Sequence, residues 1–348
     1  MNAQGLPEQL EQHQAVLGVV GEALSQVVAI FDRQLASPID PVQQLCSHVE
    51  RYRGKMLRPT LVLVSGLAAA PAWDTAPDID LSSLLTRDHF VVAAVCEMVH
   101  MATLVHDDVL DEAEIRRRGK TVNNLRGNEA AVMLGDYLLA SAYQLCATLA
   151  TPAPAAAIGR ASMTTAAGEL VQLHHRGDLA MPESTYFDII TGKTAELIAT
   201  ACQLGALASS APAPSVEALR QFGLSIGQAF QIQDDILDLT GREDVVGKSV
   251  GKDLEKAKPT LPLIHHIRVS SVVERDRSLA LAAAVGTSGQ GMSRELLARI
   301  ESTGSVNYAR DTARKLIARA HQSLQTLEPS PARDALDTIA DAVLDRAV

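Results

Sequence analysis

The chain has few aromatic residues, few cysteines and a shortage of positive charge. Only 3% of its 348 residues are Phe, Trp or Tyr, whereas 47% are apolar. Most of the apolar residues are Ala, Leu and Val, and this composition favours helix over β-sheet. The net charge of −10 argues against a nucleic-acid-binding surface. It also means that an anionic substrate must be met by cations gathered locally.

The cysteines and the N-terminus indicate where the protein works. Cys46, Cys96, Cys146 and Cys202 fit neither a zinc site nor a disulfide framework, so we expect small core residues in a reducing compartment. The first residues lack the basic start and apolar core of a signal peptide. No run of about 18 apolar residues is free of charges. We therefore expect a cytoplasmic protein without a membrane span and without a nucleic-acid partner.

Motifs for nucleophilic catalysis or nucleotide binding are also missing. The sequence contains no G-x-S-x-G, no complete P-loop and no G-x-G-x-x-G. The G-K-T at 192–194 lacks the upstream glycine that a P-loop needs. Chemistry by metal ions and by stabilisation of a leaving group is therefore favoured over a side-chain nucleophile.

Two copies of the pattern D-D-x-x-D are the main positive feature. Their carboxylates are Asp107, Asp108, Asp111, Asp234, Asp235 and Asp238. On a helix, residues four apart share a face and lie about 6 Å apart along the axis, so the like charges repel one another. All-oxygen ligands suit Mg²⁺, Mn²⁺ or Ca²⁺, and Mg²⁺ keeps positions for substrate phosphates. The alternative is two solvated acidic helix faces, and finding the pattern twice weighs against it.

Cations cluster near the acidic motifs and near glycines. They are Lys55, Arg58, Arg116, Arg117, Arg118, Lys193, Lys248, Lys252 and Lys258. Arg can hold a phosphate as a bidentate fork and Lys as a point charge. There are more cations than one diphosphate needs, which indicates two anion sites, one of them free of metal. His100 is a candidate for the metal-free site, although a lone histidine in an apolar helix is as often a core residue.

The helical periodicity predicts one all-α domain over residues 1–348, with roughly ten or more helices. Segments with a period near 3.6 and their breaks predict helices over 7–36, 58–70, 88–111, 129–149, 154–176, 183–208 and 215–239. Asp88 is the expected N-cap of the helix that carries the first acidic motif. That motif lies at a helix C-terminus, where the dipole disfavours carboxylates, which again indicates a bound cation.

The ordered motifs resemble the trans-isoprenyl diphosphate synthases, also called polyprenyl synthetases. The segments that carry the resemblance are G-K-M-L-R-P (54–59), E-M-V-H (97–100), H-D-D-V-L-D-E-A-E-I-R-R (106–117), G-N-E-A-A-V-M-L-G-D-Y-L-L (127–139), G-E-L (168–170), G-K-T (192–194), A-F-Q-I-Q-D-D-I-L-D (229–238), G-K-S-V-G-K-D-L (247–254) and K-P-T-L-P (258–262). One departure is R-R-R-G-K-T, where the family often has R-R-G-K-P-T. The resemblance implies a single helical bundle around a central cavity.

The resemblance also implies roles for individual residues. The two acidic motifs would hold three Mg²⁺ ions and, with Arg116, Lys193 and Lys248, form the catalytic group. The allylic diphosphate would be bound by Arg116, Lys193, Thr194, Gln231, Lys248 and Lys258. Isopentenyl diphosphate would be bound by Gly54, Lys55, Arg58, His100 and Arg117. Ionisation of the allylic diphosphate and attack by the double bond of isopentenyl diphosphate would then lengthen the chain, and we expect a homodimer.

Product length should depend on the helix upstream of Asp107. Cys96, Val99, Ala102 and Thr103 would face the growing tail, and the family's bulky aromatic floor is absent at the last two positions. Each helical turn that is cleared adds about 5 Å, comparable to one isoprene unit. We therefore expect a medium to long product of about C30 or more, with geranylgeranyl or farnesyl diphosphate as the alternative.

Three other classes of protein share parts of this pattern. A class I terpene cyclase would usually carry an N-S-E-type second motif, and a di-iron bundle needs paired E-x-x-H motifs, of which only Glu97-x-x-His100 is present. A non-catalytic regulatory subunit of a synthase should have lost acidic motifs, and both are intact here. Diphosphate release that depends on Mg²⁺, a primer and isopentenyl diphosphate discriminates among these classes.

Overall fold

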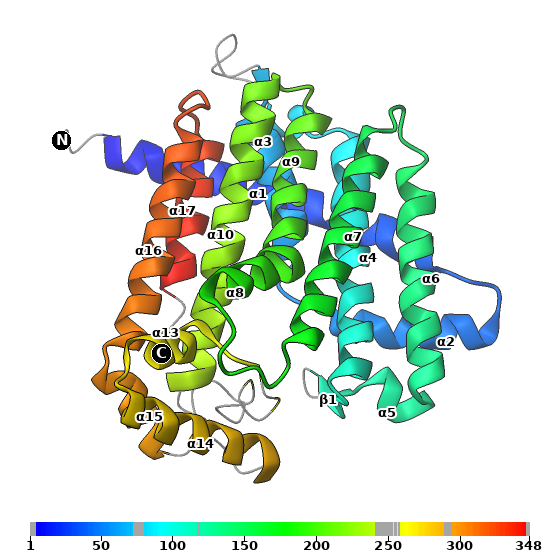
Figure 1. Cartoon of the computed structure of the whole chain (residues 1–348). Helices are drawn as coiled ribbons and strands as arrows, with labels where there is room; N and C mark the ends of the chain where they lie inside the picture. The colour runs from blue at the N-terminus through cyan, green and yellow to red at the C-terminus, as the bar shows by residue number, and fades with distance from the viewer. Residues whose placement is uncertain are drawn as a thin grey trace. The chain divides into compact units, whose positions relative to one another are not determined.

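The computed structural model describes residues 5–71, 80–116, 119–240, 253, 256, 258–288 and 294–345. Within these ranges the chain is almost entirely helical, which confirms the all-α prediction (Figure 1). The first half contains α1 (Gly5–Leu35), α2 (Asp40–Val49), η1 (Glu50–Tyr52), α3 (Leu57–Ala68), η3 (Leu81–Leu84), α4 (Arg87–Leu110), β1 (Ile115–Arg116), β2 (Gly119–Lys120), α5 (Val122–Arg126), α6 (Asn128–Cys146) and α7 (Ala153–His174). The second half contains α8 (Glu183–Ile190), η4 (Thr191–Ala195), α9 (Glu196–Ala208), α10 (Ala213–Thr240), α13 (Leu261–Val269), α14 (Val272–Ser288), α15 (Arg294–Ser302), α16 (Ser305–Leu324) and α17 (Pro331–Leu344).

The chain divides into two compact units that alternate along the sequence. The first contains Met1–Ser162, Leu197–Arg220 and Leu324–Asp337, and the second contains Met163–Glu196, Gln221–Ser323 and Thr338–Val348. Three of the divisions fall inside the helices α7, α10 and α17, and the other two fall at the first residue of α9 and the last residue of α16. No sequence break marks these places, so the prediction of a single domain over 1–348 stays a prediction.

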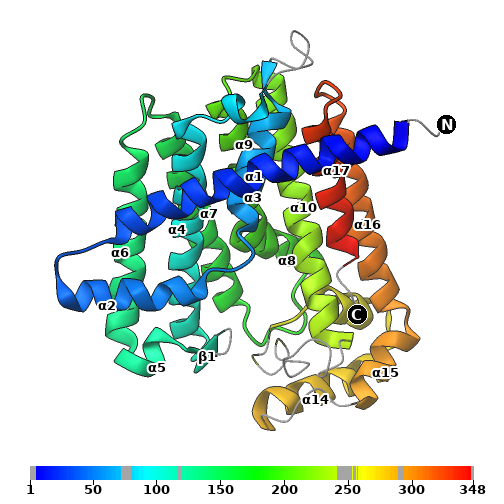
Figure 2. The same cartoon turned by 180° about the vertical axis from the view of Figure 1, so that it is seen from behind.

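The first unit is built around α4. From Val91 to Met101 nearly every side chain of α4 except that of His100 is buried, because the helix packs against α3 and α6 and is crossed by α1 (Figures 1 and 2). Close approach of helices requires glycine at several places, including Gly205 and Gly135. A Cβ on Gly205 of α9 would lie 2.1 Å from the carbonyl oxygen of Val62 in α3. A Cβ on Gly135 of α6 would lie 2.1 Å from Nε2 of His106.

The start of α4 differs from the expected N-cap. Thr86, in an extended conformation, is the N-cap and forms a capping box with His89, whereas Asp88 lies in the first turn. The backbone N–H of Thr86 donates to Nδ1 of His89 at 3.1 Å, and the other ring nitrogen lies 2.9 Å from the Ser209 hydroxyl. The Asp88 prediction was wrong because an imidazole supplied the second half of a box that usually has Glu or Gln at that place.

His89 should make the protein sensitive to acid. Burial lowers its pKa from 6.5 to about 4, so the native state holds the neutral ring while the unfolded chain takes up a proton below pH 6.5. The free energy of unfolding should therefore fall, by up to about 3 kcal/mol, as pH drops from 6.5 through 4. Urea unfolding at a series of pH values measures this slope, and His89→Gln should flatten it. Parallel profiles for the two proteins would show that His89 is not the titrating group.

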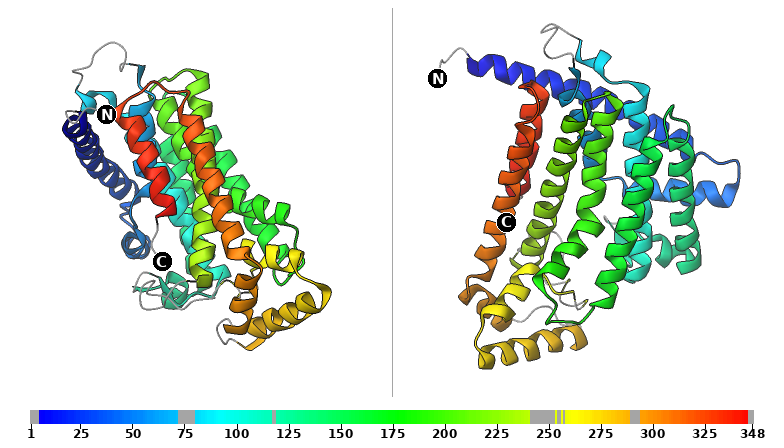
Figure 3. Two further views of the ribbon diagram at one scale, coloured as in Figure 1. Left: turned by 90° about the vertical axis from the view of Figure 1, so that its left-hand side faces the viewer. Right: turned by 45° about the horizontal axis from the view of Figure 1, so that its top comes forward.

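The second unit packs its short helices around the end of α10. Helix α13 contacts α8, α14 and α15, and the α13–α15 group forms the yellow to orange cluster in Figure 3. The expected helix over 183–208 is interrupted in its middle by η4, a single π-helical turn at Thr191–Ala195. Isolated π turns are frequent at functional sites.

Two helices of the described chain are long and apolar enough to cross a membrane by length and composition alone. They are Gln14–Leu35 and Arg87–Leu110, and 72% of the second one's apolar window is buried inside the protein. The core helix of a soluble protein passes the same test, so the expectation of no membrane span stays a prediction.

Candidate active site

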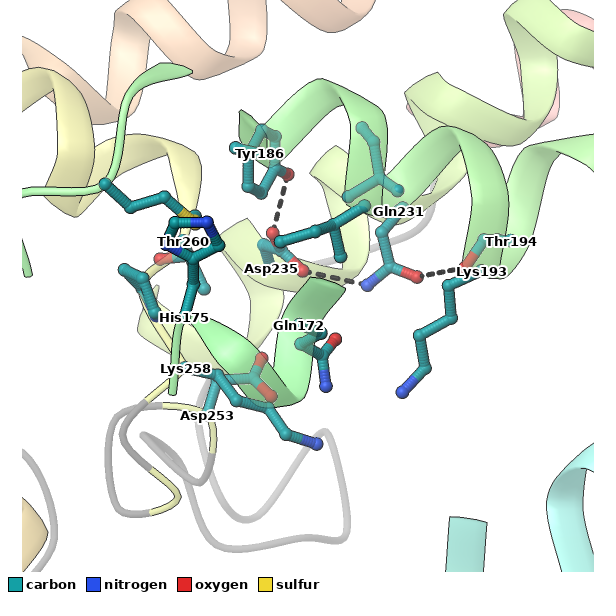
Figure 4. A pocket seen from close by; sticks show the side chains of 14 residues that line it. Gln172, His175, Tyr186, Lys193, Thr194, Gln231, Asp235, Asp253, Lys258 and Thr260 are labelled. Atoms are coloured by element: carbon teal, nitrogen blue, oxygen red, sulfur yellow. Dashed lines mark hydrogen bonds between the residues drawn. The ribbon is translucent and has the colours of Figure 1, made fainter. Parts of the chain in front are cut away.

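The second acidic motif lies at the C-terminal end of α10, and its middle carboxylate, that of Asp235, is buried. Asp235 is only 4% exposed, and both of its oxygens accept hydrogen bonds. Oδ2 accepts from the Tyr186 hydroxyl at 2.6 Å, and Oδ1 accepts from Nε2 of Gln231 at 2.9 Å. The Gln231 carbonyl in turn accepts from the Thr194 hydroxyl at 2.9 Å, so four side chains form one hydrogen-bonded row (Figure 4).

Negative charge is concentrated at this end of α10. Burial and the charge of Asp253 raise the pKa of Asp235 well above its usual range, although the bonds from Tyr186 and Gln231 oppose the shift. Burial and the charge of Asp238 raise the pKa of Asp253 to about 6, with Lys258 opposing. The Asp253 backbone N–H donates to Oδ2 of Asp238 at 3.1 Å. Carboxylates that raise one another's pKa form a donor set that a cation would stabilise.

One pocket of the second unit brings several predicted residues together. Its polar lining includes the predicted substrate-binding and metal-binding residues Lys193, Thr194, Gln231, Asp235 and Lys258. Its apolar lining includes Met181, Ile189 and Ile190. A pocket lined by both lysine ammonium groups and carboxylates can hold an anionic group, with a metal cation bridging the carboxylates and the anion. The predicted Lys248 lies outside the described residues.

The π turn places Lys193 and Thr194 at this pocket. Gly192 and Gly168 face each other so closely that a Cβ on Gly168 would lie 2.7 Å from the Lys193 backbone nitrogen. On the other side, a Cβ on Gly227 would lie 2.6 Å from the Ala195 Cα. The turn is therefore held between α7 and α10 by backbone contact. The Lys193 ammonium forms an ion pair with Glu169 of α7.

The first acidic motif ends α4 in the first unit. Asp108 is 1% exposed, and Nε of Arg116 donates to its two oxygens at 2.9 and 3.0 Å. Burial alone would lower the pKa of Arg116, but the Asp108 carboxylate raises it. Asn123 Nδ2 donates to the Asp108 carbonyl oxygen at 3.1 Å. Asp107 and Asp111 are half-buried, and Asp111 is the C-cap of α4.

The three aspartates differ in burial in the same way in the two motifs. The middle carboxylate of each, Asp108 or Asp235, is buried and bonded to protein donors. The first and third carboxylates are half-buried or exposed. Among the described residues no group of three or more His, Cys, Asp or Glu side chains is arranged as a metal shell. The donor chemistry nevertheless fits Mg²⁺, which takes one or two protein carboxylates and completes its shell with water and phosphate.

The residues expected to form the metal-free anion site lie around the start of α3. Gly54 and Lys55 are exposed, and Arg58 and His100 are half-buried. Burial lowers the pKa of Arg58, and the charge of the buried Glu97 opposes this. Within the described part of the chain, Nε of Arg58 is buried and has no hydrogen-bond partner. A donor in this state fits an anion that is still to be bound. The predicted Arg117 lies outside the described residues.

The residues expected to control chain length belong to the core of α4. Cys96, Val99 and Ala102 are 0%, 0% and 1% exposed, whereas Thr103 is half-buried and its hydroxyl donates to the His100 carbonyl at 2.7 Å. Burial raises the pKa of Cys96, and Cys146 and Cys202 lie near enough to add to this. All four cysteines are buried, as predicted for small core residues. A tunnel along this face stays a prediction.

Sequence reasoning missed three residues of this site. Asp253 stands inside the quoted segment 247–254, so its position beside a conspicuous G-K was available as a signal. Glu169 likewise stands inside the quoted segment G-E-L (168–170), but its pairing with Lys193 is seen only in the fold. Tyr186 carries no pattern of its own, because it meets Asp235 only through the fold.

Comparison with known proteins supplies the family. A sequence profile described as polyprenyl synthetase matches residues 40–297. The all-trans-nonaprenyl-diphosphate synthase (geranyl-diphosphate specific) of Rhodobacter capsulatus is 32% identical over 333 residues, which cover 96% of this chain and 98% of that protein. A decaprenyl diphosphate synthase structure from the same organism has a TM-score of 0.85 at 31% identity, covering 97% of this chain and 99% of that one. The structure of a polyprenyl synthase from Caulobacter crescentus, complexed with calcium and isoprenyl diphosphate, has a TM-score of 0.84 at 29% identity. The match covers 97% of this chain and 98% of that one.

Proposed function

Since this chain belongs to the polyprenyl synthetase family, we propose that it condenses isopentenyl diphosphate with an allylic diphosphate, head to tail, to a polyprenyl diphosphate of about C30 or more. The enzyme is thus a prenyltransferase, a polyprenyl diphosphate synthase. The observation that carries the proposal is the pocket at the end of α10, where Lys193, Gln231 and Asp235 meet. Relatives named for nonaprenyl and decaprenyl products support the long chain.

Carboxylates and cations divide the work on the allylic diphosphate. Asp107, Asp111, Asp234 and Asp238 are the carboxylates best exposed to hold Mg²⁺, with Asp108 and Asp235 behind them. When bound, Mg²⁺ neutralises the diphosphate and makes it a better leaving group. Lys193, at the π turn, and Arg116, held by Asp108, add positive charge where negative charge develops. We propose that Lys248 and Lys258 assist them, and that three Mg²⁺ ions take part.

The second substrate is held by cations alone. Lys55, Arg58, His100 and Arg117, with the Gly54 backbone, are the proposed receptors for isopentenyl diphosphate. The buried, unpartnered Nε of Arg58 among the described residues supports this role. Holding the double bond near the ionising allylic carbon replaces a chance collision with an oriented attack. Thr194 and Gln231 would border the space between the substrates.

The test of this function is product analysis. The pure protein is incubated with Mg²⁺, labelled isopentenyl diphosphate and, separately, C5, C10, C15 and C20 primers, and the dephosphorylated products are sized. We expect a ladder that ends at about C30 or longer. A stop at farnesyl or geranylgeranyl length would leave the enzyme class intact and overturn the long product. No elongation with any primer would favour a terpene cyclase or a non-catalytic regulatory subunit.

Replacing Ala102 with Phe should shorten the product. Ala102 is 1% exposed on the face proposed for the tail, and a benzyl group there would fill the path. Ala93→Phe is the matched control, because Ala93 is 0% exposed on the same helix but lies more than two turns away. Both variants should lose stability by about 1–3 kcal/mol from overpacking, but only the first should change product length. An unchanged length in Ala102→Phe would rule out this tunnel.

The proposal extends to assembly and location. We propose a homodimer in the cytoplasm, which is what we expect from the sequence. Sedimentation of the pure protein measures the first, and a monomer that is fully active would contradict it.

A further inference from the structure

The hydroxyl of Tyr186 has no part in the roles assigned so far. Tyr186 lies on α8 and is 3% exposed, and its hydroxyl donates to Oδ2 of Asp235 at 2.6 Å. The ring lines the same pocket as Lys193 and Gln231 (Figure 4). A buried phenol that points at a buried carboxylate of an acidic motif fixes that carboxylate in one orientation.

The direction of each hydrogen bond in the row is determined by its chemistry. Tyr186 and Gln231 both donate to Asp235, whose carboxylate can only accept in the ionised form that a cation would favour. The Gln231 amide therefore turns its carbonyl toward Thr194, whose hydroxyl donates to it at 2.9 Å. Loss of the Tyr186 hydroxyl would leave one buried oxygen of Asp235 without this donor and remove the constraint at one end of the row.

The backbone around the row has little room to compensate. Gly227 of α10 packs against Ala195 so closely that a Cβ there would lie 2.6 Å from the Ala195 Cα. At the next residue, Nε2 of Gln228 donates to the Thr191 hydroxyl at 2.7 Å. α10 is thus attached to the π turn at Gly227 and Gln228, and the row from Thr194 to Asp235 continues this attachment toward the acidic end of the helix.

We infer that Tyr186 is a positioning residue for the second acidic motif: its hydroxyl holds Asp235, and thereby the end of α10 that presents Asp234 and Asp238 to a divalent cation and a diphosphate. Tyr186 acts through Asp235 rather than on the substrate. The inference rests on the proposed function for the identity of the diphosphate substrate. Hydrogen-bond partners behind cation ligands typically change cation affinity or activity by about 10- to 100-fold when removed.

Tyr186→Phe tests this role because it removes one oxygen and keeps the ring. The probe is Mn²⁺ with inorganic pyrophosphate, titrated by calorimetry, which reads cation binding without turnover. We expect the Kd for Mn²⁺ to rise by about 10-fold and kcat to fall by a similar factor. The KM for isopentenyl diphosphate should stay within about twofold, because its proposed receptors lie elsewhere in the chain.

Tyr308→Phe is the matched control. The Tyr308 hydroxyl donates to Oε1 of Glu183 at the same 2.6 Å distance, in the same unit, but Tyr308 does not line the pocket. This variant should lose some thermal stability and keep both Mn²⁺ affinity and kcat. If both variants weaken Mn²⁺ binding equally, or if Tyr186→Phe binds Mn²⁺ as the wild type does, the positioning role is wrong.

A second variant keeps the inference testable if Tyr186→Phe fails to fold. Gln231→Leu removes the other donor to Asp235, and the inference predicts a similar loss of Mn²⁺ affinity, measured without pyrophosphate to exclude direct substrate contact. Wild-type-like Mn²⁺ affinity in a folded Gln231→Leu would overturn it. Failure of the wild type to elongate any primer would instead refute the proposed function, and the Mn²⁺ comparison would remain valid.

Discussion

Asp107→Asn should lower the turnover number for chain elongation by roughly 100- to 1000-fold. Asp107 is the first carboxylate of the motif at the end of α4 and is half-buried, whereas the neighbouring Asp108 carboxylate accepts a hydrogen bond from Arg116. Asparagine keeps the shape and removes the charge that would attract Mg²⁺. The melting temperature should change by only a few degrees, because relief of repulsion at a helix C-terminus offsets the lost interactions. Steady-state rates at several Mg²⁺ concentrations measure the effect.

Asp136→Asn is the control for this change. Asp136 lies on α6, where its carboxylate is 3.5 Å from Nε2 of His106, the residue that precedes Asp107. It is an exposed aspartate close to the motif in the fold and outside the proposed ligand set. We expect its turnover number to stay within about twofold of the wild type. Equal losses in the two variants would mean that the charge of the region, and not a cation ligand, controls the rate.

Gly205→Ala should destabilise the protein by roughly 3–5 kcal/mol or prevent folding. The added Cβ would lie 2.1 Å from the Val62 carbonyl oxygen and 2.9 Å from the Gly66 nitrogen. Both obstacles are backbone atoms of α3, so α9 and α3 would have to separate rather than rotate a side chain. Urea unfolding followed by circular dichroism measures the loss.

Gly159→Ala is the opposite case on a helix of the same protein. A Cβ built at Gly159, which belongs to α7, would have no atom within 4 Å beyond its chain neighbours and the nearby backbone of its own helix. Alanine there should stabilise the protein by about 0.5–1 kcal/mol, because glycine loses more backbone entropy on folding. Equal destabilisation by the two substitutions would show that helix propensity, and not the contact between α3 and α9, explains the effect at Gly205.

Helical periodicity predicted the elements that carry the site, because apolar residues at i, i+3 and i+4 must face a core. The helix expected at 88–111 is α4 at Arg87–Leu110, and the helix expected at 215–239 is α10 at Ala213–Thr240. The motifs therefore stand at helix ends, as predicted. The grouping of Lys193, Thr194 and Gln231 in one pocket came from the family resemblance, since their spacing in the sequence carries no such information.

What the sequence left out are contacts between side chains that are distant along the chain. Tyr186 and Asp235 are 49 residues apart, and no local pattern links a phenol to a carboxylate at that separation. The sequence predicts a short break or helix end at I-T-G-K-T, but not its form as a π turn at Thr191–Ala195. Glycines of α7 and α10 pack against the backbone of this turn, and such contacts between distant segments are not readable from T-G-K-T-A. The N-cap prediction at Asp88 failed for a related reason. Thr86 is the N-cap and its capping box is completed by the His89 side chain, so Asp88 lies in the first turn of the helix.

The buried thiols can report local opening of the folded chain. Cys46, Cys96, Cys146 and Cys202 all belong to the first unit, and burial raises the pKa of each thiol, that of Cys202 to about 12. A protonated, covered thiol does not react with an alkylating reagent, so labelling requires the surrounding helices to open. The rate at which each cysteine is alkylated under native conditions therefore gives the opening free energy of the first unit at four separate points, without any engineered probe.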